Sequence, residues 1–249
     1  MQDFAQHLIN GTSLGSIYAL IALGYTMVYG ILQLINFAHS DVYMVGAFSA
    51  YYVSRFFQLQ NHPGIGSLVL LILTSMIACS LLGLTIERLA YRPLRKAPKL
   101  NILITAIGVS LFLQYSGQVL FGADPKVFPQ IISDSVLFEV EGFQLKSLDV
   151  TVLIVTLIMM LALNFLIFKT KVGKAMRAVS INMSVAALLG VNTDRIISFT
   201  FIVGSSLAGV GSVLVGIKYP KIEPLMGMMI GLKAFVAAVL GGIGSIPGA

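Results

Sequence analysis

Long stretches without a charged side chain are the feature that most constrains how this chain can fold. Counting histidine as neutral, such runs cover residues 4–40, 56–86, 100–123, 150–168 and 196–217. A transmembrane α-helix needs about 20 mainly apolar residues, so each run is long enough to cross the hydrocarbon core of a bilayer. A helix on the surface of a soluble protein would instead carry a polar stripe along one face. The runs therefore predict a membrane protein rather than a soluble globule.

The overall composition supports the same prediction. Hydrophobic residues make up 57% of the chain and charged residues 10%, with a mean hydropathy of +0.92, whereas soluble domains are about 25% charged. The net charge of +6 does not indicate a nucleic-acid partner, because basic residues of membrane proteins collect in cytoplasmic loops. The single cysteine, Cys79, lies inside an apolar run and is expected to be a small buried side chain.

We expect an all-α fold, a polytopic transmembrane helix bundle that forms a single transmembrane domain over residues 1–249. Glycines four residues apart, such as Gly227 and Gly231, favour close approach of helix backbones within it. The polar amides Gln114, Gln118 and Asn164 are expected to form hydrogen bonds between helices. The chain shows about seven expected spans, at roughly 8–30, 42–58, 66–86, 100–121, 150–168, 196–217 and 225–243.

The distribution of charge predicts how the bundle is oriented. Ten of the sixteen lysines and arginines lie in two segments, 87–99 and 169–195, whereas the segment 122–149 between them is mainly acidic. Two spans separate the basic segments, so both lie on one side of the membrane, and the positive-inside rule makes that side cytoplasmic. Counting back through the spans places the N-terminus outside.

Two of the connecting segments have recognisable patterns. The alternating stretch VLFEVEGFQL within 122–149 fits a short hairpin or an extended piece on the outer face. Residues 173–190 predict one amphipathic helix that ends at Gly190, and Asn192, Thr193 or Asp194 can cap the next helix. Such a helix either lies on the membrane surface or docks into a partner. Its apolar face is formed by Ala178, Ile181, Val185 and Leu188.

The chain offers little that indicates an enzyme. GTSLG at 11–15 matches a nucleophile pattern, but it lies in an apolar helical run rather than at a strand-to-helix turn. The sequence contains no phosphate-binding loop of the G-x-x-x-x-G-K-[ST] type, and its three histidines are too far apart to form a metal-binding pair. We therefore expect no catalytic residues, no metal and no cofactor.

Polar residues at membrane depth are better functional candidates, because burying them there costs free energy. Asn36 and His39 lie between the first two expected spans. This segment is either a plain turn at the cytoplasmic interface or a broken, re-entrant element that lines a translocation path. Lys233 either extends its amine to an interface or pairs inside the bundle. Asn36, His39 and Lys233 are thus the candidate path residues.

Four segments, in order along the chain, carry a family resemblance. They are TSLGSIYALIALGYTMVYGILQLINFAHSDVYMVGAF at 12–48, IERLAYRPLR at 86–95, VGKAMRAVSINMSVAALLGVNTDRI at 172–196 and GLKAFVAAVLGGIGSIPGA at 231–249. Together they resemble the branched-chain amino acid ABC transporter permeases of the LivH type. The resemblance implies one permease subunit of an ATP-driven importer of Leu, Ile or Val in the bacterial inner membrane. The implied partners are a second related permease, two cytoplasmic ATP-binding subunits and a periplasmic substrate-binding protein.

The resemblance also implies that 173–190 is the coupling segment that docks onto an ATPase subunit. The implied coupling residues are Gly173, Arg177, Ala178, Asn182, Ala186 and Gly190. This chain differs from the family pattern in having Ser40 where a glycine usually follows His39, and Ile181 and Asn182 where acidic residues often stand. Family members also continue beyond the final motif, so we expect a fragment that lacks at least one span.

Two other functions fit parts of the sequence. Permeases of the same fold move urea or short amides, and the four segments do not separate them from amino acid permeases. A self-contained secondary transporter or channel would need no ATPase, but it would show inverted repeats with charged residues at the midplane. No such repeat is evident, which favours the ATP-driven importer.

Overall fold

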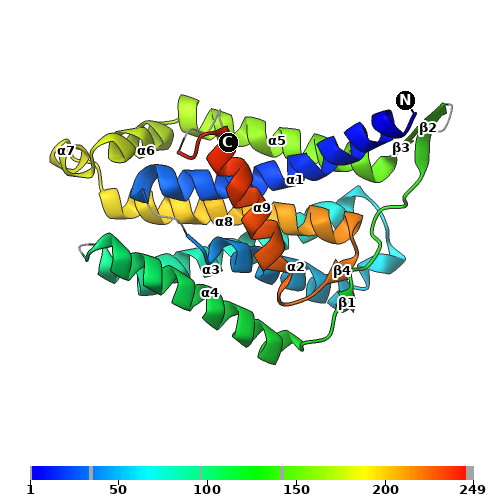
Figure 1. Ribbon diagram of the computed structural model, residues 1–249, viewed down its shortest axis with the longest axis horizontal. Helices are drawn as coiled ribbons and strands as arrows, with labels where there is room; N and C mark the ends of the chain where they lie inside the picture. The colour runs from blue at the N-terminus through cyan, green and yellow to red at the C-terminus, as the bar shows by residue number, and fades with distance from the viewer. Residues whose placement is uncertain (1, 34–35, 96, 141–142, 245–249) are drawn as a thin grey trace.

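The computed structural model describes residues 2–33, 36–95, 97–140 and 143–244 (Figure 1). Its α-helices are α1 (Gln2–Leu32), α2 (His39–Phe56), α3 (Ile65–Ile86), α4 (Lys99–Phe121), α5 (Ser147–Lys169), α6 (Lys171–Ile181), α7 (Met183–Leu188), α8 (Thr193–Lys218) and α9 (Met226–Gly241). Shorter helical turns are η1 (Leu59–Asn61), the π-helical turn η2 (Glu87–Tyr91) and η3 (Arg92–Leu94). The strands are β1 (Lys126–Val127), β2 (Val136–Val140), β3 (Phe143–Lys146) and β4 (Lys221–Ile222).

The all-α prediction is confirmed, and every expected span falls on a helix. Five helical stretches are long and apolar enough to cross a membrane. The other two helices that coincide with expected spans are shorter: α2 has 18 residues and α9 has 16. Helix α2 is mostly buried among its neighbours even though it carries Asp41 and Arg55. The bundle therefore contains five candidate spans, with two shorter helices packed against them.

Helix α8 lies at the centre of the bundle. It packs against α1, α2 and α3, and nearly all of its residues from Gly204 to Ile217 are buried. Figure 1 shows the long helices running along the length of the molecule, while α9 crosses α1 steeply. Helix α8 is one of these long helices, so its two ends lie at opposite ends of the bundle.

Glycines let α8 and its neighbours approach closely. A Cβ atom added to Gly209 would lie 2.8 Å from the backbone oxygen of Ser75 in α3, and one added to Gly83 of α3 would overlap the Ser205 side chain. Cys79 is buried in the same region, as expected. Because lipid supplies no hydrophobic drive for helix association, such close van der Waals packing is what holds membrane helices together.

We predict that alanine has opposite effects at two helical glycines. Gly209→Ala should destabilise the fold by about 1–3 kcal/mol, because the backbone atoms that its methyl group meets cannot rotate away. Gly108→Ala in α4, where the added methyl meets nothing within 4 Å, should stabilise the helix by up to about 1 kcal/mol. Thermal unfolding of the two variants in detergent measures both changes. Equal melting temperatures would contradict the packing argument.

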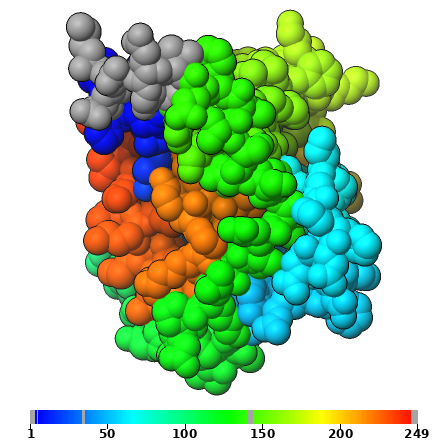
Figure 2. Space-filling view, turned by 90° about the vertical axis from the view of Figure 1, so that its right-hand side faces the viewer, coloured from blue at the N-terminus to red at the C-terminus, as the bar shows by residue number. Residues whose placement is uncertain are grey.

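The two basic segments lie at the same end of the bundle, as the charge pattern requires. They include the α3–α4 connection and the α6–α7 region, both at the left of Figure 1. The acidic segment lies at the opposite end, together with the start of α1. Figure 2 looks onto that end and shows the segment that follows α4 (green) across its middle, beside the α2–α3 connection (cyan).

The predicted hairpin is present in the acidic segment. Strands β2 and β3 pair antiparallel, and the Gln144 backbone N–H donates to Gln6 Oε1 of α1 at 2.9 Å. A second two-stranded sheet joins β1 to β4, so the connection after α4 is tied to the connection after α8. These pairings hold the non-helical chain against the end of the bundle.

The prediction of one amphipathic helix over 173–190 is wrong, because the structure has two. Asn182 lies between α6 and α7 in an extended conformation, and its side chain accepts hydrogen bonds from the Ser184 and Val185 amides. This is an N-cap, which starts a new helix at the point where the old one ends. The predicted end at Gly190 is confirmed, with a left-handed φ of 84°, and Asn192 caps α8 through the Arg195 amide.

A buried ion pair joins three helices at the end that carries the acidic segment. Lys218, the last residue of α8, donates to Asp149 of α5 and to Ser13 of α1, both at 2.6 Å. The Lys218 and Asp149 side chains are only 12% and 5% exposed. Ser13, the apparent nucleophile of the GTSLG motif, is therefore a packing residue and a hydrogen-bond acceptor.

We predict that this pair is needed for stability, in contrast to an exposed pair nearby. Lys218→Met should cost about 3–5 kcal/mol, because it leaves the Asp149 carboxylate buried without a counter-charge. The double variant Lys218→Met, Asp149→Leu should recover most of that loss. Lys146→Met, which breaks the exposed pair with Asp134, should cost less than about 1 kcal/mol. Unfolding in detergent provides the measurement, and similar losses for Lys218→Met and Lys146→Met would refute the prediction.

Candidate functional site

The chain re-enters the bundle between α1 and α2. After α1 ends at Leu32, Gln33 takes a left-handed conformation with φ of 53°, and α2 begins at His39. The His39 ring packs against Gly24, where a Cβ atom would lie 2.4 Å from its Nε2. Gly24 lies eight residues before the end of α1, which is about 12 Å along a helix. Helix α2 thus starts deep inside the bundle, which favours the re-entrant interpretation over a plain interfacial turn.

Polar contacts hold the re-entrant segment, residues 36–40, in place. Asn36 is buried, and its Oδ1 accepts a hydrogen bond from the Tyr91 hydroxyl at 2.7 Å. Tyr91 is the last residue of the π-helical turn η2, a rare local geometry that is frequent at functional sites. His39 makes an edge-on contact with the Tyr25 ring, with centroids 4.7 Å apart. Asn36 and His39 thus anchor the segment to α1 and to the turn after α3.

Ser40 shows why this position does not need the glycine that the family usually has. It lies in the first turn of α2 with a negative φ, so it needs no glycine-like conformation. Its partners on α9 are small instead: a Cβ atom added to Gly227 or Gly231 would lie 2.2 Å from Ser40 atoms. The four-residue glycine spacing on α9 therefore gives α2 the room it needs.

A cavity of about 520 Å³ lies beside the start of α2. Its wall comes from α1, the re-entrant segment, α2, α4 and α9, and it is mostly apolar with four polar side chains. The polar residues are Tyr25, Ser40, Ser110 and Gln114, and the others include Phe37, Ile107, Leu111, Met228, Met229, Leu232 and Phe235. A space of this size with a few convergent polar groups suits a small amphipathic molecule.

The predicted path residues relate to this cavity in different ways. Asn36 and His39 are buried behind it and hold the segment that carries Phe37 and Ser40. Lys233 is exposed on α9, next to the cavity residues Gly231 and Leu232 but not among them. The Gln114 amide donates to Ser110 of the same helix at 3.1 Å, and it also lies within reach of the Asp41 carboxyl group of α2.

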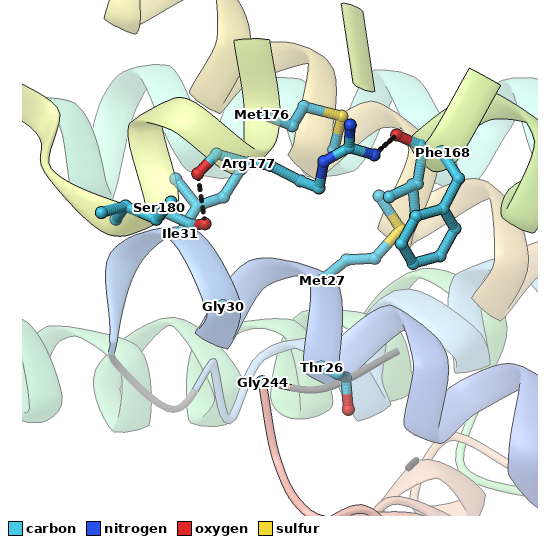
Figure 3. Close-up of a pocket in the computed structure, with 11 residues that line it drawn as sticks. Thr26, Met27, Gly30, Ile31, Phe168, Met176, Arg177, Ser180 and Gly244 are labelled. Atoms are coloured by element: carbon cyan, nitrogen blue, oxygen red, sulfur yellow. Dashed lines mark hydrogen bonds between the residues drawn. The ribbon is translucent and has the colours of Figure 1, made fainter. Parts of the chain in front are cut away.

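A tight elbow joins α5 to α6 at the basic end of the bundle. The Thr170 side chain caps α6 through the Gly173 amide at 3.0 Å. A Cβ atom at Gly173 would overlap the carbonyl oxygens of Leu166 and Ile167, so only glycine fits. Arg177 points back into this elbow, where its guanidinium donates to the Ile167 carbonyl and stacks over the Phe168 ring (Figure 3). Arg177 thus fixes the elbow and is only partly exposed.

Beyond the elbow, the end of α6 and α7 present apolar side chains outward. Ala186 is buried, and Ala178 is partly buried. Ile181 and Leu188 are each 86% exposed. Most of the apolar face predicted from the sequence is therefore not used for packing within this chain. An exposed apolar surface at the basic end is typical of a docking surface for another protein.

An ion-pair network that sequence analysis did not identify holds the two basic segments together. Arg95 contacts both the fully buried Glu87 of η2 and Asp194 at the start of α8. Arg92 adds a second contact to Asp194 at 2.6 Å, and Ser198 of α8 donates to Glu87. The only signal in the sequence was that acidic residues are rare in the basic segments, which does not reveal their partners.

The fold is that of a helical membrane protein, with a largely apolar cavity beside the start of α2 and exposed apolar side chains at its basic end. The comparison with known families agrees. Residues 7–249 match the family described as the permease component of branched-chain amino acid transport systems. The chain belongs to this family.

Individual relatives support the assignment over nearly the whole chain. The chain is 43% identical to the high-affinity branched-chain amino acid transport system permease protein LivH of Escherichia coli, and 42% identical to BraD, the protein so described in Pseudomonas aeruginosa. Each alignment covers 99% of this chain and 81% of the relative. A probable branched-chain amino acid transport permease of Methanocaldococcus jannaschii is 28% identical, with 94% and 73% covered. No solved structure shows a significant match.

The family assignment makes this chain a multi-pass membrane protein and a transport subunit rather than an enzyme. The permeases to which it is similar are described as components of branched-chain amino acid transport systems. The cavity beside α2 and the α6–α7 region are therefore candidate sites for transport rather than for catalysis.

Proposed function

We propose that this chain is one membrane-spanning subunit of an ABC importer that moves leucine, isoleucine and valine. A periplasmic binding protein delivers the amino acid, a second related permease completes the pathway, and two cytoplasmic ATP-binding subunits drive it. The observation that carries the proposal is the largely apolar cavity of about 520 Å³ beside the re-entrant segment, in a chain 43% identical to a high-affinity branched-chain amino acid permease.

The proposed path runs past the start of α2. Asn36 and His39 hold the re-entrant segment at mid-depth, so that Phe37 and Ser40 face the passing substrate. Lys233, on the exposed side of α9, meets the substrate where the path reaches the surface of the subunit. Irregular backbone at such depth is tolerated where it lines a cavity, which supports a functional role for the break between α1 and α2.

The proposed coupling segment is the α6–α7 pair. Ile181 and Leu188 supply the exposed apolar surface, while Gly173 and Arg177 make the elbow stiff enough to transmit a push. The Asn182 cap sets the angle between the two helices. Ala178, Ala186 and Gly190 complete the segment, with Gly190 ending α7 and leading the chain into α8.

We further propose that residues 1–249 act as a single membrane domain in a bacterial inner membrane. The basic end faces the cytoplasm, where the ATP-binding subunits are, and the start of α1 faces outward. The positive-inside rule supports this orientation, because the segments 87–99 and 169–195 meet at one end through Arg95 and Asp194.

The direct test is uptake of radiolabelled leucine into vesicles that contain the full assembly, ATP and the binding protein. We expect ATP-dependent uptake that unlabelled isoleucine and valine inhibit and urea does not. Uptake that persists in vesicles lacking this subunit would refute the proposal. Inhibition by urea alone would assign the chain to the amide permeases instead.

Docking can be tested separately with two leucine variants. Leu188→Ala on α7 should lower the recovery of ATP-binding subunits with the tagged permease by about threefold or more, because exposed apolar anchors carry much of an interface's free energy. Leu137→Ala in β2 is the matched control, since Leu137 is 57% exposed but lies at the opposite end of the bundle. Quantitative co-purification measures the difference. Equal recovery for both variants would count against docking at α7.

A further inference from the structure

The charge of Asp41 has no partner in the described part of the chain. Asp41 lies in the first turn of α2 and is 1% exposed. It is absent from every ion pair that the described residues form. Its Oδ2 accepts a hydrogen bond from the Ser110 hydroxyl at 2.5 Å, whereas its Oδ1 is buried without any hydrogen bond. The carboxyl group thus has an unused acceptor.

Such an arrangement requires an explanation, because a buried carboxylate is strongly unfavourable without a counter-charge. Two other acids that are buried among the described residues have partners: Glu87 is paired with Arg95, and Asp149 is paired with Lys218. Ionisable residues inside membrane bundles that are not paired commonly mark the route of a substrate or ion. Asp41 is therefore a candidate for contact with a cation that comes and goes.

Asp41 lies next to the cavity described above. Ser110, which donates to it, lines that cavity together with Gln114, one helical turn further along α4. The other wall is apolar and includes Met228, Leu232 and Phe235 of α9. The cavity therefore has an apolar side and a polar side, and the Asp41 carboxyl group lies behind Ser110 on the polar side. A branched-chain amino acid has the matching division between its ammonium group and its side chain.

We propose that Asp41, Ser110 and Gln114 form the subsite that receives the α-ammonium group of the transported amino acid. The inference rests on the proposed function and adds the group that is recognised and the residues that recognise it. The ammonium group supplies the counter-charge that Asp41 lacks, the apolar wall of α9 contacts the branched side chain, and the Tyr25 hydroxyl can donate to the carboxylate. Urea and short amides carry no cationic group, so this subsite selects against them.

The first test changes the charge of Asp41 without changing its size. In vesicles containing the full transporter, Asp41→Asn should lower the rate of ATP-driven leucine uptake by about tenfold or more, because the ammonium group loses its counter-charge. Asp124→Asn, which removes an exposed carboxylate after α4, should transport like the unaltered protein. Full uptake by Asp41→Asn would overturn the inference while leaving the proposed function intact. Absence of leucine uptake in the unaltered transporter would instead overturn the proposed function.

A second measurement leaves Asp41 in place, so it does not depend on the folding of that variant. Leu111→Cys, combined with Cys79→Ser, puts a thiol on the cavity wall, and peptide mass spectrometry follows its reaction with a maleimide. Leucine should slow the reaction, whereas 4-methylpentanoate, which is leucine without its amino group, should not. Equal protection by both compounds, or none by leucine, would show that the cavity does not recognise the ammonium group.

Discussion

Close contact between helix backbones around α8 is the constraint on which the rest of the structure depends. In a bilayer, an apolar side chain gains little by leaving lipid for protein, so association relies on packing and on interhelical hydrogen bonds. Gly209 and Gly83 bring α8 and α3 together, and Gly204 lies beside Gly24 of α1. This contact leaves α1, α2 and α3 arranged around one central helix, and the re-entrant segment fits into the space between them.

Polar interactions are concentrated where helices must be held at a fixed depth. At one end, Lys218 joins α8 to α5 and α1. At the other, Asp194 at the start of α8 contacts Arg95, which contacts Glu87 in the π-helical turn. The same turn ends at Tyr91, whose hydroxyl binds Asn36 of the re-entrant segment. These contacts, together with the turn itself, connect the start of α8 with the segment that carries the cavity residue Phe37.

Several local features could be predicted from the sequence because they depend only on neighbouring residues. The alternating stretch within 122–149 is a hairpin, Gly190 ends a helix and Asn192 begins one. The break at Asn182 was missed, although asparagine is a good N-cap, because the apolar positions on both sides of it keep a helical period. Asp41 directly follows the uncharged run 4–40, but its hydrogen bond with Ser110 depends on α4, which is distant in the sequence.

What the sequence by itself determined is that this chain forms apolar helices with two basic connections on one side, and that it belongs to a family of permeases. Uncharged runs and the distribution of lysine and arginine suffice for this, because the bilayer imposes the same requirement on every span. Only the tertiary structure decided that α2 begins deep inside the bundle and that the cavity lies beside it. That depth depends on contacts between residues that are distant in the sequence: His39 packs against Gly24, and Ser40 packs against Gly227 and Gly231. No local sequence pattern specifies such contacts.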